Sequence, residues 1–451
     1  MSEAYEMKEK IQDFLEQRTF VELKNYLLEQ NPVDIAECFD DLDEKEVSLC
    51  FRLLEKELAT EVFVNMDSDR QKSLINGLSD ARLKEILEEI CPDDAADLVG
   101  EMPAAVVSRI LKHTDKETRD AINVILRYPK NSVGSIMTTE YVSLRRDMTV
   151  GEAIAKIRRV GVDKETVYTC YVSEKRKLVG VISVKNLLTA NDDEIIENLM
   201  TTECISVLTT DDREEAVEKI GKYGFLAIPV LDKEERIVGI VTVDDAMDVA
   251  FEEATEDVEK MAGITPSDKP YLKVGVIETW LSRVPWLMLL MLSATFTGAI
   301  ISSYEEALSN LVILTSFIPM LMGTAGNAGG QSSVTVIRAL SLGDVEPKDV
   351  LRVLWKELRV SCLCGVSLAV VGYFKAIWLD GADALVALVV CLTLFATGGA
   401  AKVAGCSFPM LIKKLGFDPA VVANPFITTV IDALALIIYF AVATALIPAL
   451  S

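Results

Sequence analysis

Near its C-terminal end the chain reads Asn424-Pro425-Phe426-Ile427-Thr428-Thr429-Val430-Ile431-Asp432-Ala433-Leu434-Ala435-Leu436-Ile437-Ile438-Tyr439-Phe440. This stretch lies in an apolar run long enough to cross a bilayer, which requires about 20 residues. A carboxylate near the middle of a membrane costs about 2.5–3.5 kcal/mol on insertion scales, so Asp432 needs an explanation. Asn424, Thr428 and Asp432 recur one turn apart on one helical face, and their oxygens could bind a cation. We interpret this face as part of an ion path; the alternative is a carboxyl group hydrogen-bonded inside a helix bundle.

The negative charge of the chain lies before this apolar region. The 451 residues carry a formal net charge of −24, of which residues 1–130 contribute −13, residues 131–270 contribute −11 and residues 271–451 contribute none. Such an acidic region does not suit nucleic acid or anionic lipid surfaces, which require basic patches, but it does suit cations. The nine cysteines are scattered and form no Cys-x-x-Cys pair. They indicate a reducing cytosol and argue against both a disulfide framework and a structural zinc site.

Residues 1–130 are predicted to form an all-helical, acidic N-terminal domain. Apolar residues recur every three or four positions, and the breaks are typical of helix starts: Asn31-Pro32, Asp67-Ser68-Asp69, Cys91-Pro92-Asp93-Asp94 and Met102-Pro103. Short helices separated in this way predict a helical stack. Asp93, Asp94 and Asp97 are candidate metal ligands. The alternative is that they are helix N-terminal acids favoured by the helix dipole, which would explain the first two better than the third.

Residues 131–250 contain an internal repeat. Ser135-Ile136-Met137-Thr138-Thr139 returns as Asn198-Leu199-Met200-Thr201-Thr202, and Arg176-Lys177-Leu178-Val179-Gly180-Val181 returns as Glu235-Arg236-Ile237-Val238-Gly239-Ile240. Each copy combines helices with short β-rich runs, and the pair resembles tandem CBS domains, which are α/β regulatory modules. The resemblance implies an adenine nucleotide as an additional ligand. The second copy keeps the Thr242-x-x-Asp245 ending usual for a ribose contact, whereas the first has Ser183-x-x-Asn186.

A strongly acidic helix is predicted to leave the second copy and to continue as a connecting helix over residues 251–270. Its carboxylates are candidate metal ligands: Asp245, Asp248, Glu252, Glu256, Asp257 and Glu259. All but Asp257 follow spacings of three and four, so they share one face. Like charges at this spacing cost about 0.2–0.5 kcal/mol per pair, which favours a role in binding cations. The alternative is an ordinary solvated outer face.

Residues 271–451 are predicted to form an α-helical membrane domain. The apolar runs cover residues 284–303, 311–337, 360–379, 385–411 and 421–449, which makes five spans. Basic residues cluster before the first run, between the second and third, and between the fourth and fifth. By the positive-inside rule the N-terminal part is cytosolic and the C-terminus lies outside.

The second run contains Gly326-Asn327-Ala328-Gly329-Gly330-Gln331, whose amides are costly in lipid. We expect Gly326, Asn327, Gly329 and Gln331 to line the path with Thr428; close helix packing through Gly326-x-x-x-Gly330 is the alternative. In the fourth run, Lys402 either snorkels to the interface or balances a negative charge.

The whole chain resembles the MgtE magnesium channel and transporter family. The resemblance rests on the domain order and on specific motifs: Arg283-x-Pro285-Trp286, Gly326-Asn327-x-Gly329-x-Gln331, Leu415-Gly416-x-Asp418-Pro419-Ala420, Pro425-Phe426-x-Thr428-Thr429 and Asp432. It implies a homodimer in the lipid of the cytoplasmic membrane, with the path between protomers built mainly from the second and fifth spans. It also implies that the connecting helix acts as a plug when cytosolic Mg²⁺ is high.

The expected function is therefore transport of Mg²⁺, gated by Mg²⁺ binding to the acidic soluble domains, and not catalysis. No Walker loop or Ser-His pairing is present in the sequence. The alternative function is transport of another divalent cation, Mn²⁺ or Co²⁺, with regulation by a nucleotide at the CBS domains. The all-oxygen ligand set favours a hard ion, and the lack of His or Cys in the path argues against zinc.

Overall fold

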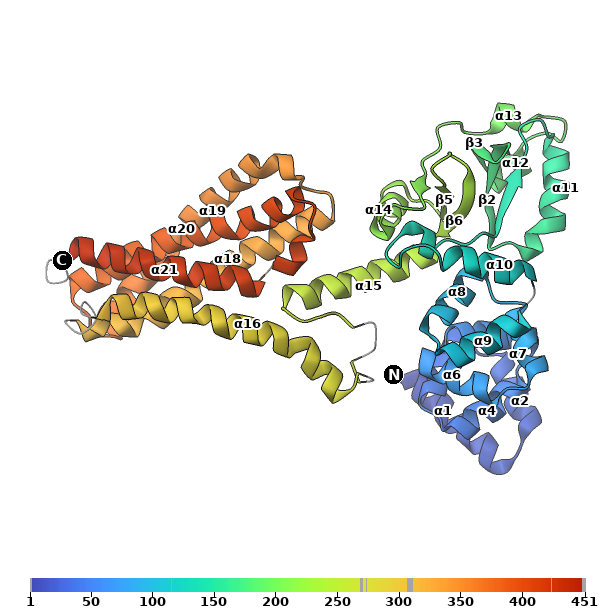
Figure 1. The fold of residues 1–451 in the computed structure, drawn as a ribbon, viewed down its shortest axis with the longest axis horizontal. Coiled ribbons are helices and arrows are strands. Elements are labelled where there is room, and N and C mark those ends of the chain that lie inside the picture. The colour runs from blue at the N-terminus through green and yellow to red at the C-terminus, as the bar shows by residue number, and fades with distance from the viewer. Residues whose placement is uncertain are drawn as a thin grey trace. The chain divides into compact units, whose positions relative to one another are not determined.

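The computed structural model of the chain describes residues 2–114, 116–267, 271–272, 274–305, 311–422 and 424–447. Two compact units make up the chain, Met1–Ala250 and Phe251–Ser451. The predicted fold class is confirmed: a helical N-terminal domain, a pair of small sheets, and five long apolar helices in the C-terminal region (Figure 1).

Short helices, ten in the described part of the N-terminal domain, form a stack. α1 packs on α3, α3 on α5, α5 on α7 and α7 on α9, while α2 packs on α4 and α4 on α6. One continuous apolar core lies between these two columns. The helices are α1 (Ser2–Gln17), α2 (Phe20–Leu28), α3 (Pro32–Asp40), α4 (Glu44–Leu53), α5 (Lys56–Val64), α6 (Ser68–Gly77), α7 (Asp80–Leu87), α8 (Pro92–Glu101), α9 (Ala104–His113) and α10 (Lys116–Ile125).

The predicted helix starts are confirmed, and local capping explains them. The Asn31 side chain accepts a hydrogen bond of 2.9 Å from the backbone N–H of Val33 as α3 begins, and proline follows at the first helical position. Proline suits that position because its missing N–H would have no helical partner there. Asp67 caps α6 by accepting 3.1 Å from the N–H of Asp69. α8 likewise begins with a proline, directly after Cys91.

The repeat forms two three-stranded sheets, with strand orders β1-β2-β3 and β4-β5-β6. In each sheet the first pair of strands is parallel and the second antiparallel. Figure 1 shows the sheets side by side, and the backbone N–H of Ile237 donates 2.9 Å to the carbonyl of Arg176 to join them. The elements are η1 (Val133–Ser135), β1 (Tyr141–Leu144), α11 (Val150–Val160), η2 (Gly161–Asp163), β2 (Thr166–Glu174), β3 (Lys177–Ser183), α12 (Val184–Thr189), α13 (Ile196–Leu199), β4 (Val207–Leu208), α14 (Arg213–Tyr223), β5 (Ala227–Leu231) and β6 (Ile237–Thr242).

The predicted acidic helix is confirmed as α15 (Val243–Met261), but its bounds differ from the expected connecting helix over residues 251–270. It starts directly after β6 and ends nine residues early. Gly263 explains the end, because its φ of +70° reverses the chain and its N–H bonds to the carbonyl of Lys260. The N–H of Ile264 bonds to the carbonyl of Glu259, which completes a Schellman motif.

Five helical segments of the described residues are long and apolar enough to cross a membrane. They comprise α16 (Val276–Ser303), η3 (Val312–Phe317) with α18 (Ile318–Ser341), η4 (Pro347–Asp349) with α19 (Val350–Trp378), α20 (Ala384–Lys414) and α21 (Asn424–Leu446), which η5 (Pro419–Val422) precedes. α18, α20 and α21 pack against one another, α19 packs on α20, and α16 packs on α21 (Figure 1).

Glycine allows the central helices to approach closely. A methyl group on Gly405 of α20 would lie 2.2 Å from the carbonyl oxygen of Gly329 of α18. A methyl group on Gly329 would lie 2.0 Å from Cδ1 of Ile431 and 3.0 Å from the carbonyl oxygen of Ala401. Gly329 therefore has the packing role that small residues have between membrane helices.

We predict that Gly329→Ala lowers the thermal stability of the detergent-solubilised protein, because overpacking typically costs about 1–3 kcal/mol. Gly323→Ala in the same helix is the matched control, since no atom lies within 4 Å of its added methyl group. Thermal unfolding followed by gel filtration measures both. Equal melting temperatures for the two variants would contradict the close contact of α18 with α20 and α21.

Candidate functional site

Asp432 lies in α21 and faces α18. A methyl group on Gly326 would lie 3.5 Å from Oδ1 of Asp432 and 3.8 Å from Cγ2 of Thr428. Both polar side chains are half-buried, and no hydrogen bond or ion pair of the Asp432 carboxylate occurs within the described part of the chain. The structure thus brings together three of the residues predicted for the path. The side chain of Asn424, a fourth, lies outside the described residues.

Asn327 and Gln331 open onto a separate pocket. Both side chains are exposed, and the pocket of about 590 Å³ lies between α18, α19 and α20. Its lining residues are Thr324, Asn327, Ala328, Gln331, Leu363, Cys364, Ser367, Leu368 and Lys402. Asp432 is not among the lining residues of this pocket. The predicted path segment combines glycines that pack closely, such as Gly329, with exposed amides.

Lys402 balances a carboxylate inside the helix bundle. Its Nζ lies 3.7 Å from Oε2 of Glu357, and the two residues are 6% and 9% exposed. Ser332 donates a hydrogen bond of 2.5 Å to the same Glu357 oxygen and accepts one of 3.4 Å from Lys402. Of the two alternatives for Lys402, charge balance is observed. Its partner is Glu357 of α19, which the sequence analysis did not single out.

The C-terminal end of α15 binds to the loop before α21. Lys260 forms ion pairs of 2.8 Å with Asp418 and 2.5 Å with Glu256. Although burial lowers it, the hydrogen bonds to these two carboxylates raise the pKa of Lys260 overall. Met261 packs against the buried residues Ile337 and Ala420. This contact uses Lys260 and Asp418, neither of which was a predicted site residue.

The other acidic residues of α15 have different surroundings. Asp257 accepts a hydrogen bond of 3.4 Å from Ser341, and Glu259 accepts one of 3.1 Å from the N–H of Ser267. Asp248 and Glu252 are exposed. The single acidic stripe predicted from sequence is therefore divided, and only its middle part faces solvent.

Three predicted ligands come together where α8 begins beside the start of α15. The charges that act most strongly on Asp93 and Asp94 are other carboxylates, with Asp245 first among them. Asp93 is 7% exposed, and its Oδ1 has no hydrogen-bond partner among the described residues. Thr242 donates to the Asp245 carboxylate. Asp97, one turn further along α8, is exposed.

The pKa values of this acidic cluster are all raised, which means that the folded protein disfavours its charged form. Burial, followed by repulsion from Asp245, raises the pKa of Asp93 well above its usual value. Burial and the same neighbour raise the pKa of Asp94 to about 7. Burial raises the pKa of Asp245 to about 6, although the hydrogen bond from Thr242 opposes this. A cation would relieve this repulsion.

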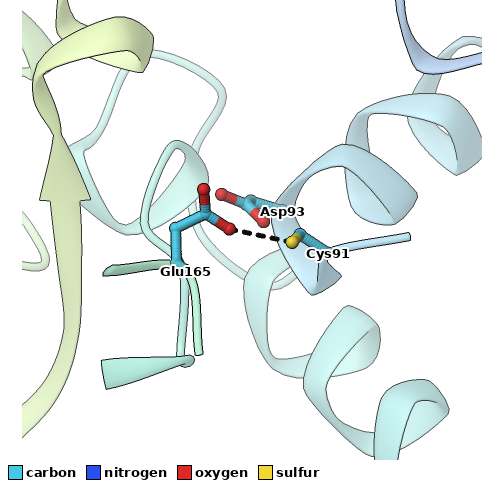
Figure 2. Close-up of side chains that lie close together, drawn as sticks. All are labelled: Cys91, Asp93 and Glu165. Carbon is cyan, nitrogen blue, oxygen red and sulfur yellow. Dashed lines mark hydrogen bonds between the residues drawn. The ribbon is translucent and has the colours of Figure 1, made fainter. Parts of the chain in front are cut away.

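Two further residues belong to the cluster and were missed by the sequence analysis. Cys91 donates a hydrogen bond of 2.8 Å from Sγ to Oε2 of Glu165, and Asp93 lies beside them (Figure 2). Cys91 precedes α8, whereas Glu165 precedes β2 in the first sheet. No spacing rule relates positions that lie 74 residues apart.

A second pocket, of about 330 Å³, lies between the two sheets. Ser183 and Asn186 of the first copy line it, and Phe225 and Pro229 of the second copy do so too. The Thr242-x-x-Asp245 ending is not among its lining residues, because Asp245 belongs to the acidic cluster.

Comparisons with known proteins agree with this architecture. Residues 318–442 match a family described as a divalent cation transporter, residues 30–131 match the MgtE intracellular N domain, and residues 133–193 and 196–252 each match the CBS domain. The magnesium transporter MgtE of Thermus thermophilus is 36% identical, over 97% of this chain and 98% of that protein. The chain belongs to the MgtE family. The MgtE of Bacillus subtilis is 34% identical over 95% of both chains.

Among solved structures, the cytosolic domain of the Mg²⁺ channel MgtE in complex with ATP is similar to the MgtE-family chain described here. It has a TM-score of 0.52 and 35% sequence identity, covering 54% of this chain and 99% of that one. The family and the five apolar helices establish a multi-pass membrane protein.

We predict that, without divalent ions at pH 8, Asp94→Asn raises the melting temperature of this MgtE-family protein. A carboxyl group whose folded pKa exceeds its unfolded pKa destabilises the folded state once it is ionised, so neutralising it gains on the order of 1 kcal/mol. The exposed Asp97→Asn is the matched control and should change the melting temperature less. A lower melting temperature for Asp94→Asn would show that the Asp94 carboxylate is stabilised instead.

Proposed function

We propose that the chain transports Mg²⁺ across the cytoplasmic membrane, and that cytosolic Mg²⁺ bound to the acidic soluble domains closes the path. One observation carries the proposal: Asp432 is a carboxylate in a membrane helix without a described hydrogen-bond or ion-pair partner, held against Gly326. Glu357, a buried carboxylate of α19, is already balanced by Lys402. A carboxylate without a counter-charge in a membrane helix is expected to bind the transported ion.

The chemistry of the path suits Mg²⁺. This ion loses its water reluctantly and is usually held by one or two carboxylates while it keeps several waters. In the proposed homodimer, the Asp432 carboxylates of the two protomers face each other and share one hydrated ion, with Asn424 and backbone carbonyls as further ligands. Such weak, water-mediated binding also allows the ion to leave, as conduction requires.

The relatives named as magnesium transporters favour this ion over Mn²⁺ or Co²⁺. Because transport accounts for these features, we propose no enzymatic activity for the chain. The soluble domains face the cytosol and the C-terminus lies outside, because basic residues cluster in the loops on the cytosolic side.

Gating follows from the free-energy cost of bringing the carboxylates of the acidic cluster close together. Asp93, Asp94 and Asp245 repel one another when no cation is bound. Carboxylate oxygens are ligands that Mg²⁺ uses in proteins, so a bound Mg²⁺ would remove this repulsion. A ligand that binds one conformation better shifts the population towards it. High cytosolic Mg²⁺ would therefore favour the compact form of the soluble domains. α15, which has Asp245 in its first turn and Lys260 in its last turn against Asp418, would then hold the path closed.

An adenine nucleotide is the proposed additional ligand of the CBS pair. The pocket between the sheets has the polar groups of Ser183 and Asn186 on one wall and Phe225 on another, which suits a ribose and a purine ring. The similar cytosolic domain was solved with ATP. The carboxylate of Asp245 lies outside this pocket, so nucleotide and Mg²⁺ occupy different places.

Asp432→Asn is expected to abolish Mg²⁺ uptake into liposomes, because it removes the charge and keeps the shape of the side chain. The matched control is Asp383→Asn, an exposed carboxylate that precedes α20 and makes no side-chain cap there. Gel filtration of both variants checks the fold. Wild-type flux in Asp432→Asn would remove the ion site from α21.

Replacing Asp248, Glu252, Glu256 and Glu259 by their amides is expected to leave the channel open at high Mg²⁺. The measurement is protease protection of the segment after Lys260, with and without millimolar Mg²⁺, in the full-length protein. Mg²⁺ should protect the wild type and not the variant. Protection that ignores Mg²⁺ in the wild type would exclude the sensor.

A matched control separates specific binding from bulk charge. Glu16, Glu22, Glu29 and Glu44 are exposed on the N-terminal helices, and replacing all four by glutamine removes the same charge. This control should keep its Mg²⁺-dependent protection. Loss of protection in the control as well would mean that net charge, and not the carboxylates of α15, controls the path.

A further inference from the structure

The acidic cluster contains one group of side chains with a different chemistry. Sγ of Cys91, a carboxylate oxygen of Asp93 and one of Glu165 all lie within 4.8 Å of one another. Figure 2 shows the three side chains pointing toward one common point, two from the start of α8 and one from the segment before β2. Cys91 and Glu165 are half-buried, and Asp93 is buried.

A second observation, an unpartnered buried oxygen, points to a ligand at this group. Asp93 is 7% exposed, and its Oδ1 has no hydrogen-bond partner among the described residues. A buried polar atom without a partner typically costs about 1–3 kcal/mol, and more if it is charged. The other carboxylates nearby, Asp94 and Asp245, add repulsion and supply no hydrogen bond to it. A bound cation would satisfy this oxygen and balance the charge.

The donor set identifies the class of cation. Mg²⁺ requires oxygen ligands and does not bind sulfur well, whereas Zn²⁺ and Co²⁺ accept thiolate together with carboxylate. Zinc binds sulfur at about 2.3 Å and carboxylate oxygen at about 2.0 Å, which places tetrahedral ligands about 3.3–3.6 Å apart. The three ligand atoms already lie within 4.8 Å of one another, so metal binding requires them to shift to this spacing. Three protein ligands leave a fourth position for water.

We propose that Cys91, Asp93 and Glu165 form a binding site for a thiophilic divalent cation of the Zn²⁺ class. This site shares Asp93 with the acidic cluster and differs from the all-oxygen Mg²⁺ ligands Asp94 and Asp245 by its sulfur donor. The cation displaces the thiol proton to solvent as the metal–sulfur bond forms, and neither partner is oxidised or reduced. Burial, and then the hydrogen bond to Glu165, raises the pKa of the Cys91 thiol.

A cation bound at this site would link two domains of the chain. Cys91 and Asp93 belong to the helical N-terminal domain, whereas Glu165 is bonded into the first CBS copy, where its N–H donates 3.2 Å to the carbonyl of Glu140. A cation bound by all three joins these two domains at the surface where the Mg²⁺ ligands also lie. The site does not depend on transport, so it can be tested without any flux measurement.

Co²⁺ is the probe, because only a thiolate ligand gives it a sulfur-to-cobalt charge-transfer band. The purified full-length protein is titrated with Co²⁺ under reducing conditions. We expect the band to saturate at one equivalent per chain, Zn²⁺ to abolish it, and a hundredfold excess of Mg²⁺ to leave it in place. Cys91→Ser should lack the band. Glu165→Gln should shift the titration by at least about tenfold, since even an outer-sphere partner commonly contributes that much.

Cys204→Ser is the matched control. Cys204 is also half-buried in the soluble part, but its sulfur donates to the carbonyl of Thr201 and not to a carboxylate. This variant should keep the band, and melting temperatures check that every variant folds. A wild type without the band, an equal band in Cys91→Ser, or complete displacement by Mg²⁺ would overturn the proposal. Loss of the site would leave the Mg²⁺ transport predictions unaffected.

Alkylation provides an independent measurement. A maleimide reagent followed by peptide mass mapping reports the reaction rate of each cysteine in the folded protein. Zn²⁺ should slow the labelling of Cys91 and leave that of Cys204 unchanged. If Zn²⁺ does not change the labelling of Cys91, the sulfur is not a ligand.

Discussion

Carboxylates removed from water without a counter-charge are the constraint on which both units of this chain depend. Burial raises the pKa of Asp93 well above its usual value and that of Asp94 to about 7, and other carboxylates add to this effect. In the membrane unit, Asp432 lies half-buried against Gly326 without a described ion-pair partner. Each arrangement is unfavourable for the protein alone and becomes favourable when a cation binds. A cation is therefore the ligand that we propose for both places.

The acidic residues that do have a positive partner behave differently. Glu357 is held by Lys402 and Ser332, and this polar group ties α18, α19 and α20 together. Asp418 is held by Lys260 at the end of α15. The Lys402–Glu357 pair is buried, and removing one partner from a buried pair is strongly destabilising, whereas the intact pair contributes little net stability. These two pairs therefore join neighbouring helices and loops, whereas Asp432 has no described ion-pair partner.

Close helix packing sets the position of the Asp432 carboxylate in the helix bundle. Gly329 and Gly405 allow the backbones of α18 and α20 to touch, and Gly329 also receives Ile431 of α21. Ile431 is the residue before Asp432. The contact between Ile431 and Gly329 therefore also sets the position of the Asp432 carboxylate beside Gly326. A larger residue at Gly329 would clash with Ile431 of α21, next to Asp432 in the chain.

The sequence by itself determined the local features of this protein. Proline and capping residues placed the helix starts at α3, α6 and α8, and hydropathy placed the five apolar helices, because both signals act within one turn or one segment. It also singled out Asp93, Asp94, Asp245 and Asp432 through their unusual positions. Only the tertiary structure decided which charges are balanced. The pairing of Lys402 with Glu357, the pairing of Lys260 with Asp418, and the meeting of Cys91 with Glu165 join distant segments, and no periodicity along the chain encodes such contacts. The electrostatic role of an acidic residue depends on its neighbours in space, and those neighbours exist only in the folded chain.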